Sequence, residues 1–169
     1  MYEDEAGFGR ISEPSYCWAP KDIRPIVPCH RVREYVYTYG AVDPHDGSRF
    51  FIIAPKCNTA WMNAFLAELS EHFRDDIILL YLDKASWHRS KTLKIPENIR
   101  IEYLLPYTPE MNPIEQIWKE IRRDDFKNTL FKTLDKVIDK LCDSIGSLTD
   151  SIVKSVCGRD WIMSMLNEN

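Results

Sequence analysis

Several patterns are missing from this 169-residue chain, and each absence removes a class of protein. Its five cysteines are scattered and form no C-x-x-C pair, so neither a zinc site nor a disulfide framework is indicated. No apolar run reaches 18 residues, and the N-terminus lacks a signal-peptide pattern. There is no internal repeat and no low-complexity tract. We therefore expect one domain of ordinary size, soluble and cytoplasmic, with reduced thiols.

Basic residues are also fewer than acidic ones: the chain has 22 Lys and Arg against 26 Asp and Glu, which gives a net charge of −4. Proteins that bind nucleic acid usually present a basic surface, so this balance counts mildly against such a partner. The objection is weak for a nuclease whose own carboxylates are masked by metal. Tight binding to DNA would then need help from elsewhere.

The pattern of apolar residues predicts an α/β domain with a mixed sheet, helices on both faces and a helical C-terminal tail. The runs 34–42 and 48–54 flank the turn D-P-H-D-G and predict a hairpin, and the apolar run 77–82 predicts a central strand covered on both faces. Further strands are predicted at 1–6 and 99–105. Helices are predicted at 58–73, capped by Asn58 or Thr59, at 113–123, at 131–145, stopped by Gly146, and at 148–166, broken near Gly158.

Acidic residues lie at two positions in or next to these strands that are candidates for a functional site. Asp83 directly follows the run 77–82, and ligands of open α/β sheets bind at the carboxyl ends of strands. An Asp that caps the turn after the strand is an equal alternative. In the first strand, alternation places Asp4 on one face with Tyr2 and Ala6, and Glu3 and Glu5 on the other. Asp4 is thus the better inward candidate, and the alternative is a charged edge strand.

A third carboxylate, Glu115, opens a predicted helix and has a serious structural alternative. With Asn112 as N-cap and Pro113 at the first helical position, Glu115 would complete a capping box. Its face continues with three cations, which suits a phosphate site beside a DNA track but also an ordinary solvated helix: Lys119, Arg122 and Arg123.

Three converging carboxylates indicate metal-dependent phosphodiester chemistry. Two Mg²⁺ ions about 4 Å apart can activate a water or hydroxyl and stabilise the leaving oxygen of an in-line displacement. Magnesium prefers oxygen ligands, and one or two carboxylates per ion suffice because it keeps several waters. One Asp bridging both ions is the economical arrangement.

Two phrases carry a resemblance to a known family. Y-L-D-K-A-S-W-H (81–88), followed by L-P-Y-T-P-E-M-N-P-I-E-Q-I-W (105–118), resembles the catalytic core of DDE transposases, in particular the bacterial insertion-sequence-630 branch of the mariner-like superfamily. The segments E-D-E-A-G-F (3–8) and Y-C-W-A-P (16–20) resemble the first catalytic strand of that family and the segment after it. The likeness runs over nearly the whole chain.

The resemblance implies an RNase H-like fold in a single DDE catalytic domain, residues 1–169, that cuts transposon ends and joins the freed 3′ hydroxyl to target DNA. It implies the triad Asp4, Asp83 and Glu115, binding two Mg²⁺ or Mn²⁺ ions with Asp83 between them. Family members carry an N-terminal helix-turn-helix module, and because Asp4 lies so near Met1 we expect that module to be missing from this chain. A split or frameshifted element with the module encoded upstream, a decayed copy and a truncated chain are the alternatives. We also expect a homodimer.

Other residues have two interpretations each. His88 matches a histidine of the family and would contact the scissile phosphate or a metal-bound water, or else is a turn residue with no role. Arg89, Lys91 and Lys94 would follow the DNA backbone, or are simply solvated. Two rival functions remain: a stand-alone RNase H-like nuclease, and a non-catalytic remnant that serves as a dimerisation or interaction module.

Overall fold

A five-stranded mixed sheet forms the centre of the computed structural model, which describes residues 1–169 except 30, 106–107, 109–110, 161–162 and 165–169. The strand order is β3-β2-β1-β4-β5, in which β1, β2 and β3 are antiparallel neighbours and β4 and β5 run parallel to β1. The bounds are β1 Tyr2–Ile11, β2 Arg31–Val42, β3 Arg49–Ala54, β4 Ile78–Leu82 and β5 Ile99–Tyr103. The predicted hairpin is confirmed as β2 and β3.

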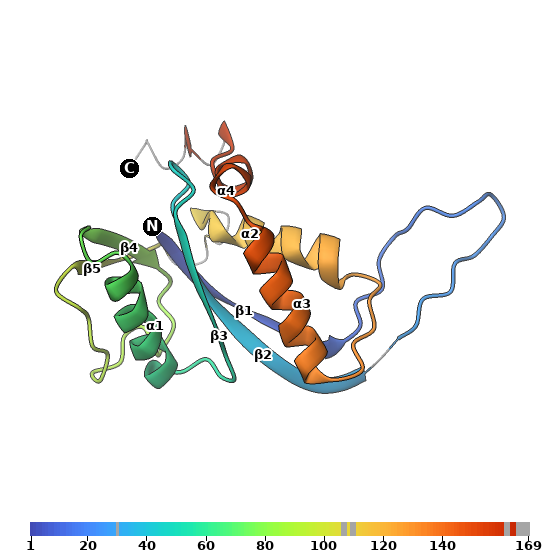
Figure 1. Ribbon diagram of the computed structural model, residues 1–169, viewed down its shortest axis with the longest axis horizontal. Helices are drawn as coiled ribbons and strands as arrows, with labels where there is room; N and C mark the ends of the chain where they lie inside the picture. Colours follow the sequence, from blue (N-terminus) through green and yellow to red (C-terminus); the bar gives the residue numbers. More distant parts are fainter. Residues whose placement is uncertain (30, 106–107, 109–110, 161–162, 165–169) are drawn as a thin grey trace.

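Helices cover the two faces of the sheet, each over its own apolar core (Figure 1). Met62, Phe65 and Leu69 of α1 pack on one face, against Leu80 and Leu82 of β4. The other face carries the remaining helices, whose core includes Phe8 and Trp118. The helical bounds are α1 Thr59–His72, α2 Ile114–Ile121, the π-helix η2 Arg122–Phe126, α3 Leu134–Ser147 and α4 Asp150–Cys157. Among the described residues, no helix has the length and apolar character needed to cross a membrane.

Several local predictions about helix ends can be compared with these bounds. The Asn58 side chain accepts the Trp61 N–H at 3.0 Å and so caps α1 as predicted, and α4 ends at Cys157, directly before Gly158. Gly146 does not stop α3, which continues to Ser147. A Cβ at this position would meet no neighbouring atom within 4 Å, so no close packing requires a glycine there. The helix predicted at 113–123 continues as η2, which keeps Phe126 in the core.

The two strands that flank the site also differ from expectation. β1 extends to Ile11 rather than ending at residue 6, because Phe8 continues the buried face and β2 pairs along its length. The expectation that the run 77–82 is covered on both faces is wrong. Leu80 and Leu82 are buried beneath α1, but Leu79 on the opposite face is 41% exposed. The helices of that face cover β1 and β2 and leave β4 partly open (Figure 1).

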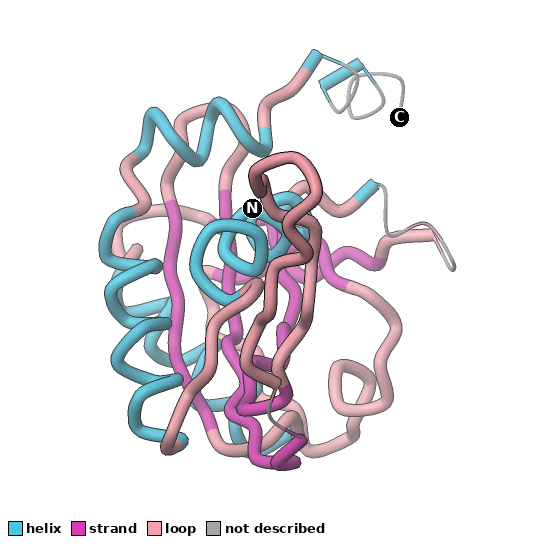
Figure 2. Tube along the Cα trace, turned by 90° about the vertical axis from the view of Figure 1, so that its right-hand side faces the viewer, coloured by secondary structure: helices cyan, strands magenta, loops and turns pink. Residues whose placement is uncertain are grey.

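A long arm, described over residues 12–29, follows β1 and leaves the body of the molecule (Figure 1); it points toward the viewer in Figure 2. Its base is attached where the Ser15 N–H donates to Asn128 Oδ1 at 2.8 Å. Farther out, Tyr16 and Trp18 are fully exposed and Ile26 is 96% exposed. These apolar side chains lie outside both apolar cores of the molecule.

Candidate active site

Strand pairing brings the first two predicted carboxylates to the same level of the sheet. Tyr2 of β1 lies opposite Tyr81 of β4 in a parallel pair, so Asp4 and Asp83, each two residues later, end up side by side. Both line one open pocket of about 770 Å³. The other residues that line it are Glu5, Gly7, Tyr35, Tyr37, Pro55, Lys56, Cys57, Ala85 and Trp87.

The third carboxylate, Glu115, lies on α2 and does not line this pocket, but its charge acts on Asp4. Trp118 Nε1 donates to Asp4 Oδ2 at 3.0 Å, and Glu115 lies one helical turn before Trp118. Burial, followed by the negative charge of Glu115, raises the pKa of Asp4 to about 7. Among the described residues, neither Asp4 nor Glu115 forms an ion pair with a Lys or Arg. The two carboxylates therefore repel each other unless a proton or a cation lies between them.

The capping box that offered a structural role for Glu115 is not formed. Asn112 does not cap the helix; its Nδ2 donates to the Glu3 carbonyl oxygen at 2.9 Å and ties the start of α2 to β1. The helix begins at Ile114, after Pro113, with no side-chain cap. The prediction of Asn112 as N-cap is wrong because a contact distant in sequence takes its side chain.

Asp83 is held in the turn that follows β4. Its Oδ1 accepts the Ala85 N–H at 2.8 Å and lies 2.9 Å from His88 Nδ1. The side chain is nevertheless 59% exposed, so it caps the turn and still faces the pocket. The two interpretations of Asp83 therefore coexist.

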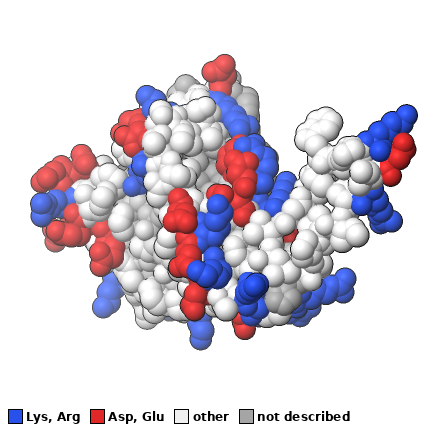
Figure 3. All heavy atoms as spheres, turned by 45° about the vertical axis from the view of Figure 1, so that its right-hand side comes forward, with Lys and Arg blue, Asp and Glu red and all other residues white. Residues whose placement is uncertain are grey.

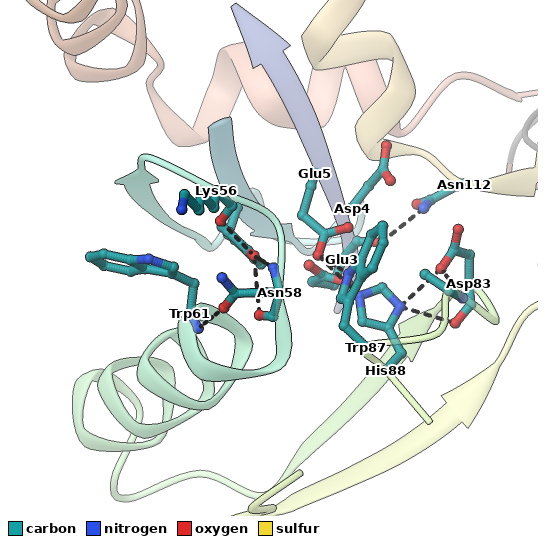
Figure 4. A network of polar contacts seen from close by, with 12 residues as sticks. Glu3, Asp4, Glu5, Lys56, Asn58, Trp61, Asp83, Trp87, His88 and Asn112 are labelled. Carbon is teal, nitrogen blue, oxygen red and sulfur yellow. Dashed lines mark hydrogen bonds and ion pairs between the residues drawn. The ribbon is translucent and has the colours of Figure 1, made fainter. Parts of the chain in front are cut away.

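His88 is buried, with 1% of its surface exposed, and its ring makes contacts outside its own turn. Its ring lies between Asp83 and Glu5, and its Nε2 is 3.1 Å from Glu5 Oε1 (Figure 4). Burial lowers the pKa of His88, but the hydrogen bond and charge of Glu5 and the contact with Asp83 outweigh it, so the pKa is raised overall. His88 thus couples the turn of Asp83 to β1.

Glu3 and Glu5 are the site residues that the sequence placed wrongly. We expected them to point outward, and the alternative was an edge strand, but β1 lies between β2 and β4 and both of its faces are covered. Glu3 is 0% exposed and the Glu5 side chain 6% exposed. Trp87 Nε1 donates to Glu5 Oε1 at 2.7 Å. The alternation of Ala6 and Phe8 beyond the acidic run was the signal that the strand continues into the interior.

Glu3 is the fully buried carboxyl group of the cluster. Burial, together with the charges of Glu5, Asp4 and Asp83, raises its pKa well above the ordinary value. Neither carboxylate oxygen has a hydrogen-bond partner among the residues that the structure describes. Such a group is costly to bury in its charged form.

The predicted DNA-contacting cations are dispersed. Arg89, Lys91, Lys94 and Lys119 are exposed. Arg122 lies 5.1 Å from the centre of the Phe8 ring, and Arg123 pairs with Glu120 and Asp124. Lys56, which sequence reasoning missed, lines the pocket itself; a single Lys in the turn after β3 gives no local signal. Figure 3 shows acidic and basic side chains interspersed over the face in view.

Comparisons with known proteins place this geometry in a family context. The family described as DDE superfamily endonuclease matches residues 1–138. A curated relative, the uncharacterized protein y4pE/y4sA of Sinorhizobium fredii (strain NBRC 101917 / NGR234), is 37% identical over 99 residues, which cover 58% of this chain and 73% of the relative.

Solved structures of the Mos1 transposase are also similar. The Mos1 strand transfer complex has a TM-score of 0.71 and 13% identity, covering 98% of this chain and 52% of the Mos1 chain. A pre-cleavage Mos1 transpososome has a TM-score of 0.74 and 10% identity, covering 99% of this chain and 53% of the Mos1 chain. The Mos1 catalytic domain with raltegravir and Mn has a TM-score of 0.62 and 12% identity, covering 94% of this chain and 75% of the Mos1 chain. The chain thus spans about half the length of the Mos1 chains in the two complexes. The likeness confirms the predicted RNase H-like fold.

Proposed function

Because the chain belongs to the DDE superfamily endonucleases, we propose that it is the catalytic domain of a transposase that cuts DNA at transposon ends and joins the freed 3′ hydroxyl to target DNA. The observation that carries this proposal is that Asp4 of β1 and Asp83, just after β4, line one pocket, while the charge of Glu115 on α2 acts on Asp4. The motifs quoted above favour the insertion-sequence-630 branch and a single catalytic domain over residues 1–169. The bacterial cytoplasm is the proposed compartment.

Asp4, Asp83 and Glu115 are the proposed ligands of two Mg²⁺ or Mn²⁺ ions, with Asp83 shared between the ions. Their oxygen atoms suit these metals, and the mutual repulsion of Asp4 and Glu115 is what a bound cation would relieve. Such ions supply activation of the attacking oxygen and stabilisation of the leaving oxygen. The three carboxylates therefore suit Mg²⁺ or Mn²⁺ as ligands.

The surrounding side chains orient these ligands. Trp118 fixes one oxygen of Asp4, and the Ala85 amide together with His88 fixes Oδ1 of Asp83, so the carboxylates are positioned before DNA arrives. Lys56 on the pocket wall is suited to bind a phosphate of the cut strand. The exposed cations are proposed to follow the DNA backbone: Arg89, Lys91, Lys94 and Lys119.

The proposed reaction consists of two displacements at phosphorus. In cleavage, a water oxygen bonds to phosphorus and the 3′ oxygen leaves as a hydroxyl. In joining, that hydroxyl attacks a target phosphodiester, one P–O bond forms and one breaks, and no further energy source is needed. Since the chain spans about half of the Mos1 chains, we propose that a helix-turn-helix module encoded upstream selects the ends.

A panel of labelled DNA substrates tests this function. We expect joined products from a duplex with an exposed 3′ hydroxyl at the inverted repeat that flanks the gene, in Mg²⁺ or Mn²⁺ and not in chelator. Cleavage of RNA–DNA hybrids or junctions with no joining would replace the proposal with a stand-alone nuclease. Absence of both cleavage and millimolar metal binding, with DNA present, would favour the interaction module.

The arm supports the proposal that two copies act together. Tyr16 and Trp18 are fully exposed, and burying two such side chains in a partner contributes roughly 3 kcal/mol or more. The double change Tyr16→Ser and Trp18→Ser is therefore expected to raise the dissociation constant of the dimer at least about a hundredfold, measured by sedimentation. Ile77→Ser, at an exposed apolar position outside the arm, is the matched control and should leave the dimer unchanged. A wild-type chain that stays monomeric at high micromolar concentration contradicts the proposal.

A further inference from the structure

Glu3, Glu5 and His88 form a second cluster of metal-ligating groups, on the face of β1 opposite Asp4 (Figure 4). One ligand atom from each lies within 4.8 Å of the others. His88 Nε2 is 3.1 Å from Glu5 Oε1 and 3.7 Å from Glu3 Oε2. Tetrahedral ligands with metal bonds of about 2.0–2.2 Å lie roughly 3.4 Å apart. The two measured separations bracket that value, so an ion would need little rearrangement.

An independent observation indicates that this cluster receives a ligand. Glu3 is completely buried, and neither of its oxygens has a hydrogen-bond partner in the described part of the chain. The 3.7 Å separation from His88 is too long for a hydrogen bond. A buried carboxylate without a partner costs several kcal/mol, so either a proton or a cation must neutralise it. A bound dication would complete the polar contacts that the protein leaves unmade.

The groups around the cluster have the arrangement typical of metal ligands. A metal-bound histidine usually donates its other ring N–H to a carboxylate, and His88 Nδ1 lies 2.9 Å from Asp83 Oδ1. Glu5 is in turn oriented by the Trp87 indole N–H. When His88 gives up its Nε2 proton to bind a metal, the two carboxylates and the neutral imidazole carry a charge of −2, which one divalent ion cancels. Glu5 also borders the open pocket, which provides an entry path.

We propose that Glu3, Glu5 and His88 bind a first-row transition ion such as Mn²⁺ or Zn²⁺, at a site separate from the one formed by Asp4, Asp83 and Glu115. The imidazole ligand favours these ions over Mg²⁺, which prefers oxygen. The ion fixes the ring of His88 and thereby the direction of the N–H that holds Asp83. It acts as a structural ion that positions a carboxylate of the proposed catalytic site.

Metal titration of a variant that lacks two of the three proposed catalytic ligands tests this site. The parent is the full chain with Asp4→Asn and Glu115→Gln, changes that leave the contacts of His88 intact. After chelation and dialysis it is titrated with Co²⁺ and Zn²⁺, by calorimetry and by the visible absorption of Co²⁺. We expect one ion per chain, and at least a hundredfold weaker binding when Glu3→Gln or His88→Gln is added.

The control is His45→Gln, which removes an exposed histidine far from the cluster in sequence and should leave the titration unchanged. Far-ultraviolet circular dichroism checks that each variant is folded, and the near-isosteric Glu3→Gln serves if His88→Gln unfolds. A parent that binds no ion, or that binds it as tightly with Glu3→Gln, overturns the proposal and assigns a proton to Glu3. Because no DNA is present, failure here is distinguishable from failure of the transposase proposal.

Discussion

Asp83→Asn is expected to lower the rate of metal-dependent DNA cleavage at least about a thousandfold, which corresponds to about 4 kcal/mol of lost transition-state stabilisation. The amide keeps the oxygen that accepts the Ala85 N–H, so the turn after β4 is retained. It removes the negative charge that the proposed ions require at the centre of the site. Single-turnover cleavage of an end-labelled duplex in Mg²⁺ and in Mn²⁺ measures the effect.

Asp75→Asn is the matched control, because Asp75 is exposed and does not line the pocket. It should cleave within twofold of the wild type. Asp4→Asn and Glu115→Gln should show losses of the same order as Asp83→Asn, because the three groups are proposed to act as one unit. Cleavage that survives in Asp83→Asn at wild-type rate would remove Asp83 from the site and leave the pocket with another role.

The sequence was informative about the fold where local chemistry and tertiary packing agree. The turn between β2 and β3 was readable because D-P-H-D-G joins two alternating strands, and the cap of α1 because the Asn58 side chain bonds within its own turn. Asn112 shows the opposite case. Its spacing favoured a cap, but its amide instead bonds to the Glu3 carbonyl, 109 positions away.

The carboxylates of β1 show why the site was only partly predictable. Alternation tells which residues share a face, but in an interior strand both faces are covered, so it cannot rank Asp4 above Glu3 or Glu5. Asp4 lies beside Asp83 because β1 and β4 pair in one particular parallel register, and no local pattern encodes that register. Lys56 joins the pocket through the position of the turn after β3.

The perturbed carboxyl group of Asp4 leads to a prediction for the metal-free protein. Its pKa is raised from an ordinary 3.8 to about 7, first by burial and then by the charge of Glu115, so the folded state binds a proton more tightly than the unfolded state. This contribution to stability is fully present below about pH 4 and is lost as the pH rises to 7. Since each tenfold change in proton affinity is about 1.4 kcal/mol, the loss is about 4 kcal/mol.

Urea unfolding in chelator at pH values from 4 to 7 measures that loss as the difference between wild type and Asp4→Asn. Millimolar Mg²⁺ should restore stability near pH 7, because an ion that binds the charged carboxylates of the folded state stabilises it. Asp46→Asn is the control, because the pKa of Asp46 is shifted in the opposite direction from that of Asp4. Burial acts to raise the pKa of Asp46, but hydrogen bonds involving Ser48 outweigh it and the pKa is lowered, so its contribution is lost as pH falls. Equal pH profiles for wild type and Asp4→Asn in chelator would mean that Asp4 is not buried against Glu115, and the proposed metal site would lose its basis.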